Sequence, residues 1–239
     1  MKFIMPIQKK RTKKLMVNSN TLANKNQPKK LPVFWILFLS SIIGFSLILL
    51  IQPEREAIDQ KHLPWNAHFD EQGKLHALGL TVHESTLSDA MTLYGKDVEV
   101  KLFSNKDESN KSLEAYFPVI YIGSIKAALT LRLDASEEHL KQVYSNGKKV
   151  TPTTTGELEV ELYTSDIASF FNTPISSLAL IPRNNLTERA IDKRFGVPDR
   201  KEIQSDTLPH WFFDRLGLEL ILDQEGPEAL QYTAPKINQ

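Results

Sequence analysis

Apolar positions follow a similar pattern in two stretches about a hundred residues apart, TLSDAMTLYG (86–95) and TERAIDKRFG (187–196). In the first stretch the apolar residues have the spacing of one helix face: Leu87, Ala90, Met91 and Tyr94. Thr86 can cap the first turn, with Asp89 three residues further on, and Gly95 suits the left-handed position after a helix. The pattern predicts a short helix that ends at glycine.

The second stretch has the same outline with different residues. Thr187 is placed as the cap, and Leu186 and Ile191 have the spacing of a hydrophobic staple. Phe195 precedes Gly196 as Tyr94 precedes Gly95 in the first stretch. We predict a second short helix here, again ended by glycine.

Strand-length apolar runs follow each predicted helix. After Gly95 come VEVKLF, LEAYFPVIYIG and SIKAALTLRLD, and after Gly196 come RKEIQ, HWFFD, LELILD and ALQYTA. Turn signals such as RLG and QEGPE separate the later runs. Each half is therefore expected to form a helix followed by an antiparallel meander.

The segment between the halves contains further elements. SEEHLKQVYSNG (136–147) has the pattern of a third helix, and the strand ELEVELY, the capped turn TSDIASFFN and the strand SSLALIP follow it. The Thr- and Pro-rich piece KKVTPTTTG (148–156) is predicted to be a loop and a soft boundary. The expected body is of the α+β class, with two similar helix-plus-antiparallel-sheet lobes, 63–150 and 151–239, packed together.

A charge-free apolar run, VFWILFLSSIIGFSLILLI (33–51), precedes this body. At 1.5 Å per residue its 19 residues extend about 28 Å, close to the hydrocarbon thickness of a bilayer. The run exceeds the usual length of a signal-peptide core, and no small-residue cleavage site follows it. The sequence predicts an uncleaved transmembrane signal anchor over 31–52, joined by a linker (53–62) to the body.

Charge is distributed unevenly although the net charge is zero. The tail, 1–30, has nine Lys and Arg residues and no acid, which leaves the rest of the chain at −9. The expected topology determinants are Lys9, Lys10, Arg11, Lys13, Lys14, Lys29 and Lys30. This asymmetry predicts a cytoplasmic N-terminus and, in a bacterial inner membrane, a periplasmic body. The tail is then expected to contact anionic lipid headgroups, and nucleic acid is not expected as a partner.

The second half, with LTERAIDKRFGVPDR followed by HWFFDRLGLELILDQEGPEALQY, resembles the small helix-plus-sheet domain of the BamE/SmpA/OmlA family of bacterial envelope proteins. The Gly-x-Pro turn of that family matches Gly196 and Pro198, whereas the first half has Lys96-Asp97 there. The body also resembles an uncharacterised family of proteobacterial inner-membrane proteins that share an LPW start and LILD, EG and LQY elements. The resemblance to the BamE/SmpA/OmlA family implies a protein-binding module without catalysis.

Residues with evident chemistry are few. The six histidines are scattered, the chain has no cysteine, and none of the common nucleotide-, metal- or nucleophile-binding motifs occurs. We therefore predict no catalytic, cofactor-binding or metal-binding residue, and no cofactor. The aromatic strand HWFFD offers Trp211, Phe212 and Phe213 as partner-binding residues, since alternation places at least one ring away from the core.

Three hypotheses about function remain open from the sequence. The first is a single-pass membrane protein whose body binds an unidentified envelope protein. The second is an envelope enzyme that acts on peptidoglycan or glycan through two distant carboxylates, a chemistry without a local signature. The third is a membrane-linked regulator that uses the basic tail. The sequence gives no oligomeric state.

Overall fold

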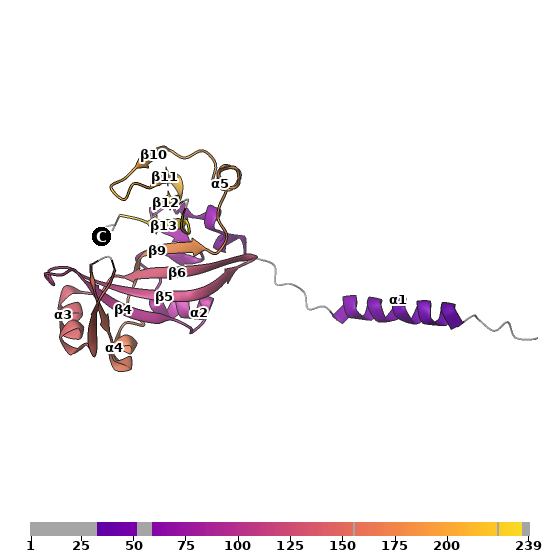
Figure 1. The fold of residues 1–239 in the computed structure, drawn as a ribbon, viewed down its shortest axis with the longest axis horizontal. Helices are drawn as coiled ribbons and strands as arrows, with labels where there is room; N and C mark the ends of the chain where they lie inside the picture. The colour runs from indigo at the N-terminus through magenta and orange to yellow at the C-terminus, as the bar shows by residue number, and fades with distance from the viewer. Residues whose placement is uncertain (1–32, 52–58, 155, 224, 236–239) are drawn as a thin grey trace, which may run out of the picture. The chain divides into compact units, whose positions relative to one another are not determined.

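The computed structural model describes residues 33–51, 59–154, 156–223 and 225–235 (Figure 1). These residues divide into two compact units, one that holds the helix α1 (Val33–Ile51) and one that holds the described residues from 59 onward. The second unit, called the body below, is mainly antiparallel sheet. The basic tail with all its predicted topology determinants, and most of the predicted linker, lie outside the described residues.

Helix α1 forms over the run that was expected to span a membrane. No helix in the described part of the chain is long and apolar enough to cross a membrane. The predicted transmembrane signal anchor, and with it the inner-membrane localisation and the periplasmic body, is wrong by this finding.

One ten-stranded sheet runs through the body, in the order β10-β11-β12-β13-β9-β6-β5-β4-β8-β7 (Figure 1). Its strands are β4 (Glu99–Ser104), β5 (Lys111–Ile122), β6 (Ile125–Leu133), β7 (Lys149–Pro152), β8 (Leu158–Glu161), β9 (Ile175–Pro182), β10 (Arg200–Ile203), β11 (Pro209–Phe213), β12 (Leu218–Ile221) and β13 (Ala229–Thr233). Every neighbouring pair is antiparallel. The sheet therefore has two free edges, at β10 and at β7.

The body has four α-helices among its described residues: α2 (Leu87–Tyr94), α3 (Glu137–Asn146), α4 (Thr164–Ser169) and α5 (Glu188–Phe195). A second, three-stranded sheet consists of β1 (His68–Phe69), β2 (Leu75–Ala77) and β3 (Leu80–Thr81). Three short 3-10 turns are η1 (Gln60–His62), η2 (Pro64–Asn66) and η3 (Asp214–Leu216). The expected linker thus ends in ordered structure, because Asp59 caps η1 by accepting from the backbone N–H of Lys61.

The predicted division into two similar lobes is wrong, because the sheet is continuous between the halves. β6, from the first half, pairs with β9 from Ala127↔Pro182 to Leu133↔Ile175. Both strands are rich in buried leucine and isoleucine, so pairing them places the middle of the sheet in one core. The predicted boundary loop 148–156 also differs, since its first part forms β7 and pairs with β8.

The two predicted helices and their caps are confirmed. The Thr86 side chain accepts from the backbone N–H of Asp89, and the Asp89 side chain accepts from that of Thr86, which completes a capping box. Thr187 accepts from the N–H of Ala190. Gly95 and Gly196 follow with φ of 101° and 84° but with extended ψ, not the left-handed conformation predicted. That backbone region is accessible essentially to glycine alone, which explains the residue at both helix ends.

Alternating burial shows how the core is built. In β5 the buried side chains are Leu113, Ala115, Phe117, Ile120 and Ile122. The alternation changes register between Phe117 and Ile120, where the strand has a bulge. Pro118 lies in this bulge, where its missing N–H costs no ladder hydrogen bond. Helices α2 and α3 pack against β5.

Candidate functional site

The largest hollow among the described residues has a volume of about 300 Å³. It lies between α5, η2, the β5–β6 turn and the ends of β9 and β13. We call it the α5 pocket. Its apolar lining residues are Pro64, Trp65, Ile125, Leu180, Pro182, Leu186, Ala190, Phe195 and Leu230. Its polar lining residues are Ser124, Lys126, Asn184, Asn185 and Arg194. A volume of this size is at the lower end of the range for ligand sites.

The sequence of α5 explains why a hollow forms beside it. Ile191 and Phe195 are buried and hold the helix on the body. Ala190 and Arg194 lie one turn apart and face the pocket. Since an alanine methyl group fills little space and an arginine keeps its charge in solvent, this side of α5 leaves the hollow open.

The part of the lining next to α5 is fixed by the start of the body. The buried hydroxyl of Tyr232, on β13, donates to the carbonyl oxygen of Pro64 at 2.8 Å. Burial raises the pKa of the Tyr232 hydroxyl well above its usual value, so the hydroxyl keeps its proton and remains a donor. This bond positions the η2 turn and its Trp65 side chain.

Trp65 is also held from the side of α5. The Arg194 guanidinium lies 4.3 Å from the centre of the Trp65 ring, and the Phe195 ring meets the same indole edge-on at 6.2 Å. A guanidinium stacked on an aromatic face is restricted in orientation while its N–H groups stay available for hydrogen bonding. The pocket therefore has a preoriented cation on an aromatic wall.

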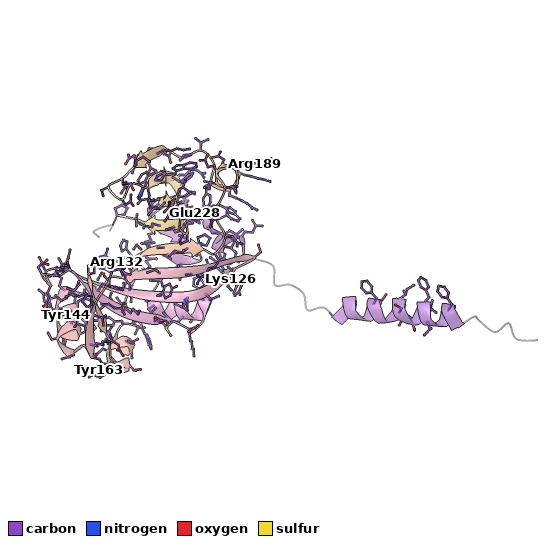
Figure 2. The ribbon with its side chains drawn as sticks, viewed as in Figure 1. Lys126, Arg132, Tyr144, Tyr163, Arg189 and Glu228 are labelled. Carbon is purple, nitrogen blue, oxygen red and sulfur yellow. The ribbon has the colours of Figure 1, made fainter. Side chains whose placement is uncertain are left out.

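The charge of the α5 pocket is of one sign among the lining residues that the structure describes. These residues include Lys126 and Arg194 but no Asp or Glu. Within the described residues neither cation is within salt-bridge distance of a carboxylate, and the Lys126 ammonium has only a distant contact, 6.0 Å, with the Tyr121 ring. The side-chain amides of Asn184 and Asn185 have no hydrogen-bond partner there either. Figure 2 labels Lys126 on the β5–β6 hairpin and Arg189 on α5.

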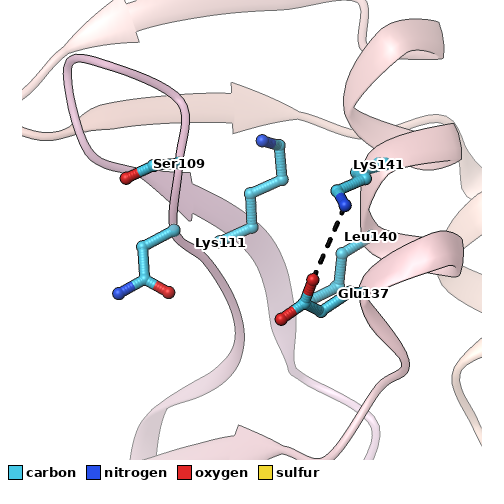
Figure 3. A pocket seen from close by; sticks show the side chains of 6 residues that line it. Ser109, Lys111, Glu137, Leu140 and Lys141 are labelled. Atoms are coloured by element: carbon cyan, nitrogen blue, oxygen red, sulfur yellow. Dashed lines mark ion pairs between the residues drawn. The ribbon is translucent and has the colours of Figure 1, made fainter.

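A smaller hollow lies between the β4–β5 turn and α3 (Figure 3). It is lined by Ser109, Lys111, Glu137 and Lys141 among others, and its volume is about 40 Å³. Glu137 and Lys141, one turn apart on α3, form an ion pair at 3.5 Å on one side of it. Because the share of one water in the liquid is about 30 Å³, this hollow has room for little more than solvent.

A third hollow, of about 260 Å³, contains two carboxylates, Asp214 and Glu219. Arg200 pairs with Asp214 at 3.5 Å, and Glu219 Oε1 accepts from His210 at 2.6 Å. Both carboxylates thus already have cationic or hydrogen-bonding partners. The arrangement does not favour the enzyme hypothesis, which needs one carboxyl group that carries a proton and another that is free.

His210 is the most buried polar side chain near this hollow, with 3% of its surface exposed. Its Nδ1 faces Glu219 and its Nε2 lies 2.9 Å from Asp206 Oδ2. Burial opposes protonation, but the two carboxylates outweigh it and raise the pKa of His210. Both ring nitrogens are therefore used within the fold. Among the described residues no group of three or more His, Asp or Glu side chains is arranged to hold a metal ion.

A hydrogen-bonded chain of Asp70, His76 and Thr81 resembles a nucleophile-activating set. His76 lies 3.0 Å from Asp70 through Nε2 and 3.0 Å from the Thr81 hydroxyl through Nδ1. Asp70, however, also accepts from the backbone N–H groups of Gln72 and Lys74, as a turn residue does. The hydrogen bond from His76, followed by that from Lys74, lowers the pKa of Asp70. None of the hollows above is lined by this chain, so we interpret it as part of the β1–β2 turn.

The aromatic strand predicted to bind a partner is covered. Trp211, Phe212 and Phe213 are all buried, with 9% of Phe212 exposed at most. The Lys201 ammonium lies 3.3 Å from the Trp211 ring centre, and the Arg200 guanidinium lies 3.7 Å from that of Phe212. Both cations come from the adjacent edge strand β10. None of the three rings lines the α5 pocket.

The residues of the α5 pocket were not singled out from the sequence. One signal was present: Arg194 stands in the second helix where the first helix has Leu93. A cation replacing an apolar residue in an otherwise matching helix indicates a changed environment on that face.

Comparison of the chain with models of protein families, with curated proteins and with solved structures gave no match. The resemblance to the BamE/SmpA/OmlA family stays a prediction, and the site must be interpreted from its own geometry.

Proposed function

We propose that the body is a non-catalytic protein-interaction module that binds a segment of a partner protein in the α5 pocket. One observation carries the proposal: a hollow of about 300 Å³ with an aromatic and aliphatic wall also has two cations that pair with no carboxylate among the described residues. Interface anchors are typically bulky side chains that enter such pockets, with polar groups around them.

Several features support a binding role over a catalytic one. The described residues of the pocket lining include no histidine, no carboxylate and no tyrosine that could act as a general acid or base. Its polar groups are one hydroxyl, two side-chain amides and two cations, which orient a ligand.

The test fills the pocket while leaving the fold in place. The full-length chain is immobilised and used to select from a library of random peptides displayed on phage. Selected peptides are then measured against Ala190→Trp, which places an indole in the pocket, and against Arg189→Trp, which places the same group on the neighbouring exposed position of α5.

We expect the Ala190→Trp variant to bind the selected peptides at least about tenfold more weakly and the Arg189→Trp variant to bind them like the parent chain. Thermal unfolding of both variants, followed by circular dichroism, checks that α5 is retained. Equal binding by the two variants, or no enrichment of any peptide by the parent chain, would show that the pocket is not a peptide site.

A further inference from the structure

The chemistry of the α5 pocket also indicates what kind of segment it takes. We infer that it recognises an acidic segment in which a bulky apolar side chain is next to an Asp or Glu residue. This inference rests on the proposed function, because it names the partner chemistry of the same pocket.

The apolar part of the ligand follows from size and lining. A hollow of about 300 Å³ admits one large anchor side chain and not a long helix or strand. Trp65 and Phe195 provide aromatic surface on one side, and Leu180 and Leu230 provide aliphatic surface at the ends of β9 and β13. An anchor with an aromatic or long aliphatic side chain buries the most surface there.

The acidic part follows from charge. Lys126 of β6 and Arg194 of α5 both line the pocket, so its two cations come from different elements. Neither has a carboxylate partner in the described part of the chain. The stacking of Arg194 on Trp65 fixes the guanidinium plane, which favours a bidentate pair with a carboxylate from the ligand.

The amides Asn184 and Asn185 complete the complementarity. They lie shortly after the end of β9, line the pocket and are exposed. A peptide has one donor and one acceptor per residue, and each amide side chain offers both groups. These two residues can therefore bind the backbone of the segment while the cations bind its carboxylate.

The experiment uses synthetic peptides of one length with a central Leu, Phe or Trp flanked by Glu, by Gln or by Lys. Affinities for the full-length chain are measured at low and at high salt. The matched variants are Arg194→Gln and Lys126→Gln in the pocket, with Arg189→Gln and Lys193→Gln as controls, which make the same change in charge on the exposed surface of α5.

We expect the Glu-flanked peptides to bind at least about tenfold more tightly than the Gln-flanked ones, with the difference reduced at high salt. Each pocket variant should remove most of that difference, and the control variants should keep it. If Ala190→Trp abolishes peptide binding but Gln-flanked peptides bind as well as Glu-flanked ones, the inference fails and the proposed function stands.

If Ala190→Trp leaves peptide binding unchanged, the proposed function fails too. A single-stranded oligonucleotide is included as a competitor. Tighter binding of that oligonucleotide, lost in Arg194→Gln and Lys126→Gln, would overturn the inference by assigning the two cations to phosphate groups.

Discussion

The body contains the same unit twice, a capped helix followed by an antiparallel meander, but the two copies pack differently. In the first unit α2 lies against β5, whose 12 residues make it the longest described strand. In the second unit α5 leads into β10, β11, β12 and β13, each of four or five residues. The first unit occupies the middle of the sheet, and the second ends at a free edge.

The helices differ in the residues at matching positions. Leu87, Met91 and Leu93 of α2 correspond to Glu188, Asp192 and Arg194 of α5. Tyr94 at the end of α2 also donates its hydroxyl to the carbonyl oxygen of Leu78. The more apolar helix is thus closely packed, whereas the more polar one leaves the α5 pocket beside it. A ligand site can form in the second unit because its helix contributes less to the core.

The two units should differ most in the free energy of unfolding that is lost when one aromatic side chain in each is truncated. Phe117 on β5 is 1% exposed, and Phe117→Ala should lower the free energy of unfolding by about 3–5 kcal/mol. Phe195→Ala should cost about 1–2 kcal/mol less, because Phe195 borders a hollow that solvent can fill once the ring is gone.

Urea unfolding of the full-length chain, followed by circular dichroism, measures both losses. Equal losses would mean that the α5 pocket is closed in solution. A larger loss for Phe195→Ala would reverse the comparison and make the second unit the more tightly packed one.

Enlarging one alanine side chain in each helix should give the next largest difference in the free energy of unfolding. Ala90 in α2 has no exposed surface, so Ala90→Leu should overpack the core and lower the free energy of unfolding by about 1–3 kcal/mol. Ala190 lies on the pocket wall, so Ala190→Leu should change stability by less than about 0.5 kcal/mol.

The same unfolding measurement compares these two variants, and both changes replace alanine by leucine in a helix of eight residues. Helix propensity therefore nearly cancels between them. A loss above about 1 kcal/mol for Ala190→Leu would contradict the open pocket that the proposed function requires.

Features that depend on residues close together in the sequence could be predicted, and contacts between residues far apart in the sequence could not. The caps Thr86 and Thr187 and the meanders depend on residues a few positions apart, which the sequence displays directly. The pairing of β6 with β9 joins residues that are between 42 (Leu133↔Ile175) and 55 (Ala127↔Pro182) positions apart. The sequence of an apolar strand does not indicate which other strand it pairs with. The prediction of two lobes was wrong for this reason.

The candidate site could not be predicted from the sequence for a related reason. At least one ring of the strand HWFFD was expected to face away from the core. Lys201 and Arg200 of the next strand lie against Trp211 and Phe212, a contact that depends on strand register. The α5 pocket arises where side chains are small or polar, as at Ala190, and no motif marks such a place. Only the arrangement of η2, α5 and the sheet ends brings its lining together.

The smallest difference concerns the two caps. Thr86 takes part in a complete capping box, in which Asp89 returns a hydrogen bond to the Thr86 backbone N–H, whereas Thr187 faces Ala190 and has no such return. The backbone and then the side-chain hydrogen bond from Thr86 lower the pKa of Asp89, so the carboxylate is ionised at neutral pH.

Thr86→Ala should therefore lower the free energy of unfolding by about 1–2 kcal/mol and Thr187→Ala by about 0.5–1 kcal/mol. Asp89→Asn removes the charge from the hydrogen bond between the Asp89 side chain and the Thr86 backbone N–H. In the Asp89→Asn background, Thr86→Ala should lower the free energy of unfolding by only as much as Thr187→Ala does in the parent chain. If the two threonine variants lose the same stability while Asp89→Asn has no effect, the difference between the caps does not contribute to the difference between the units.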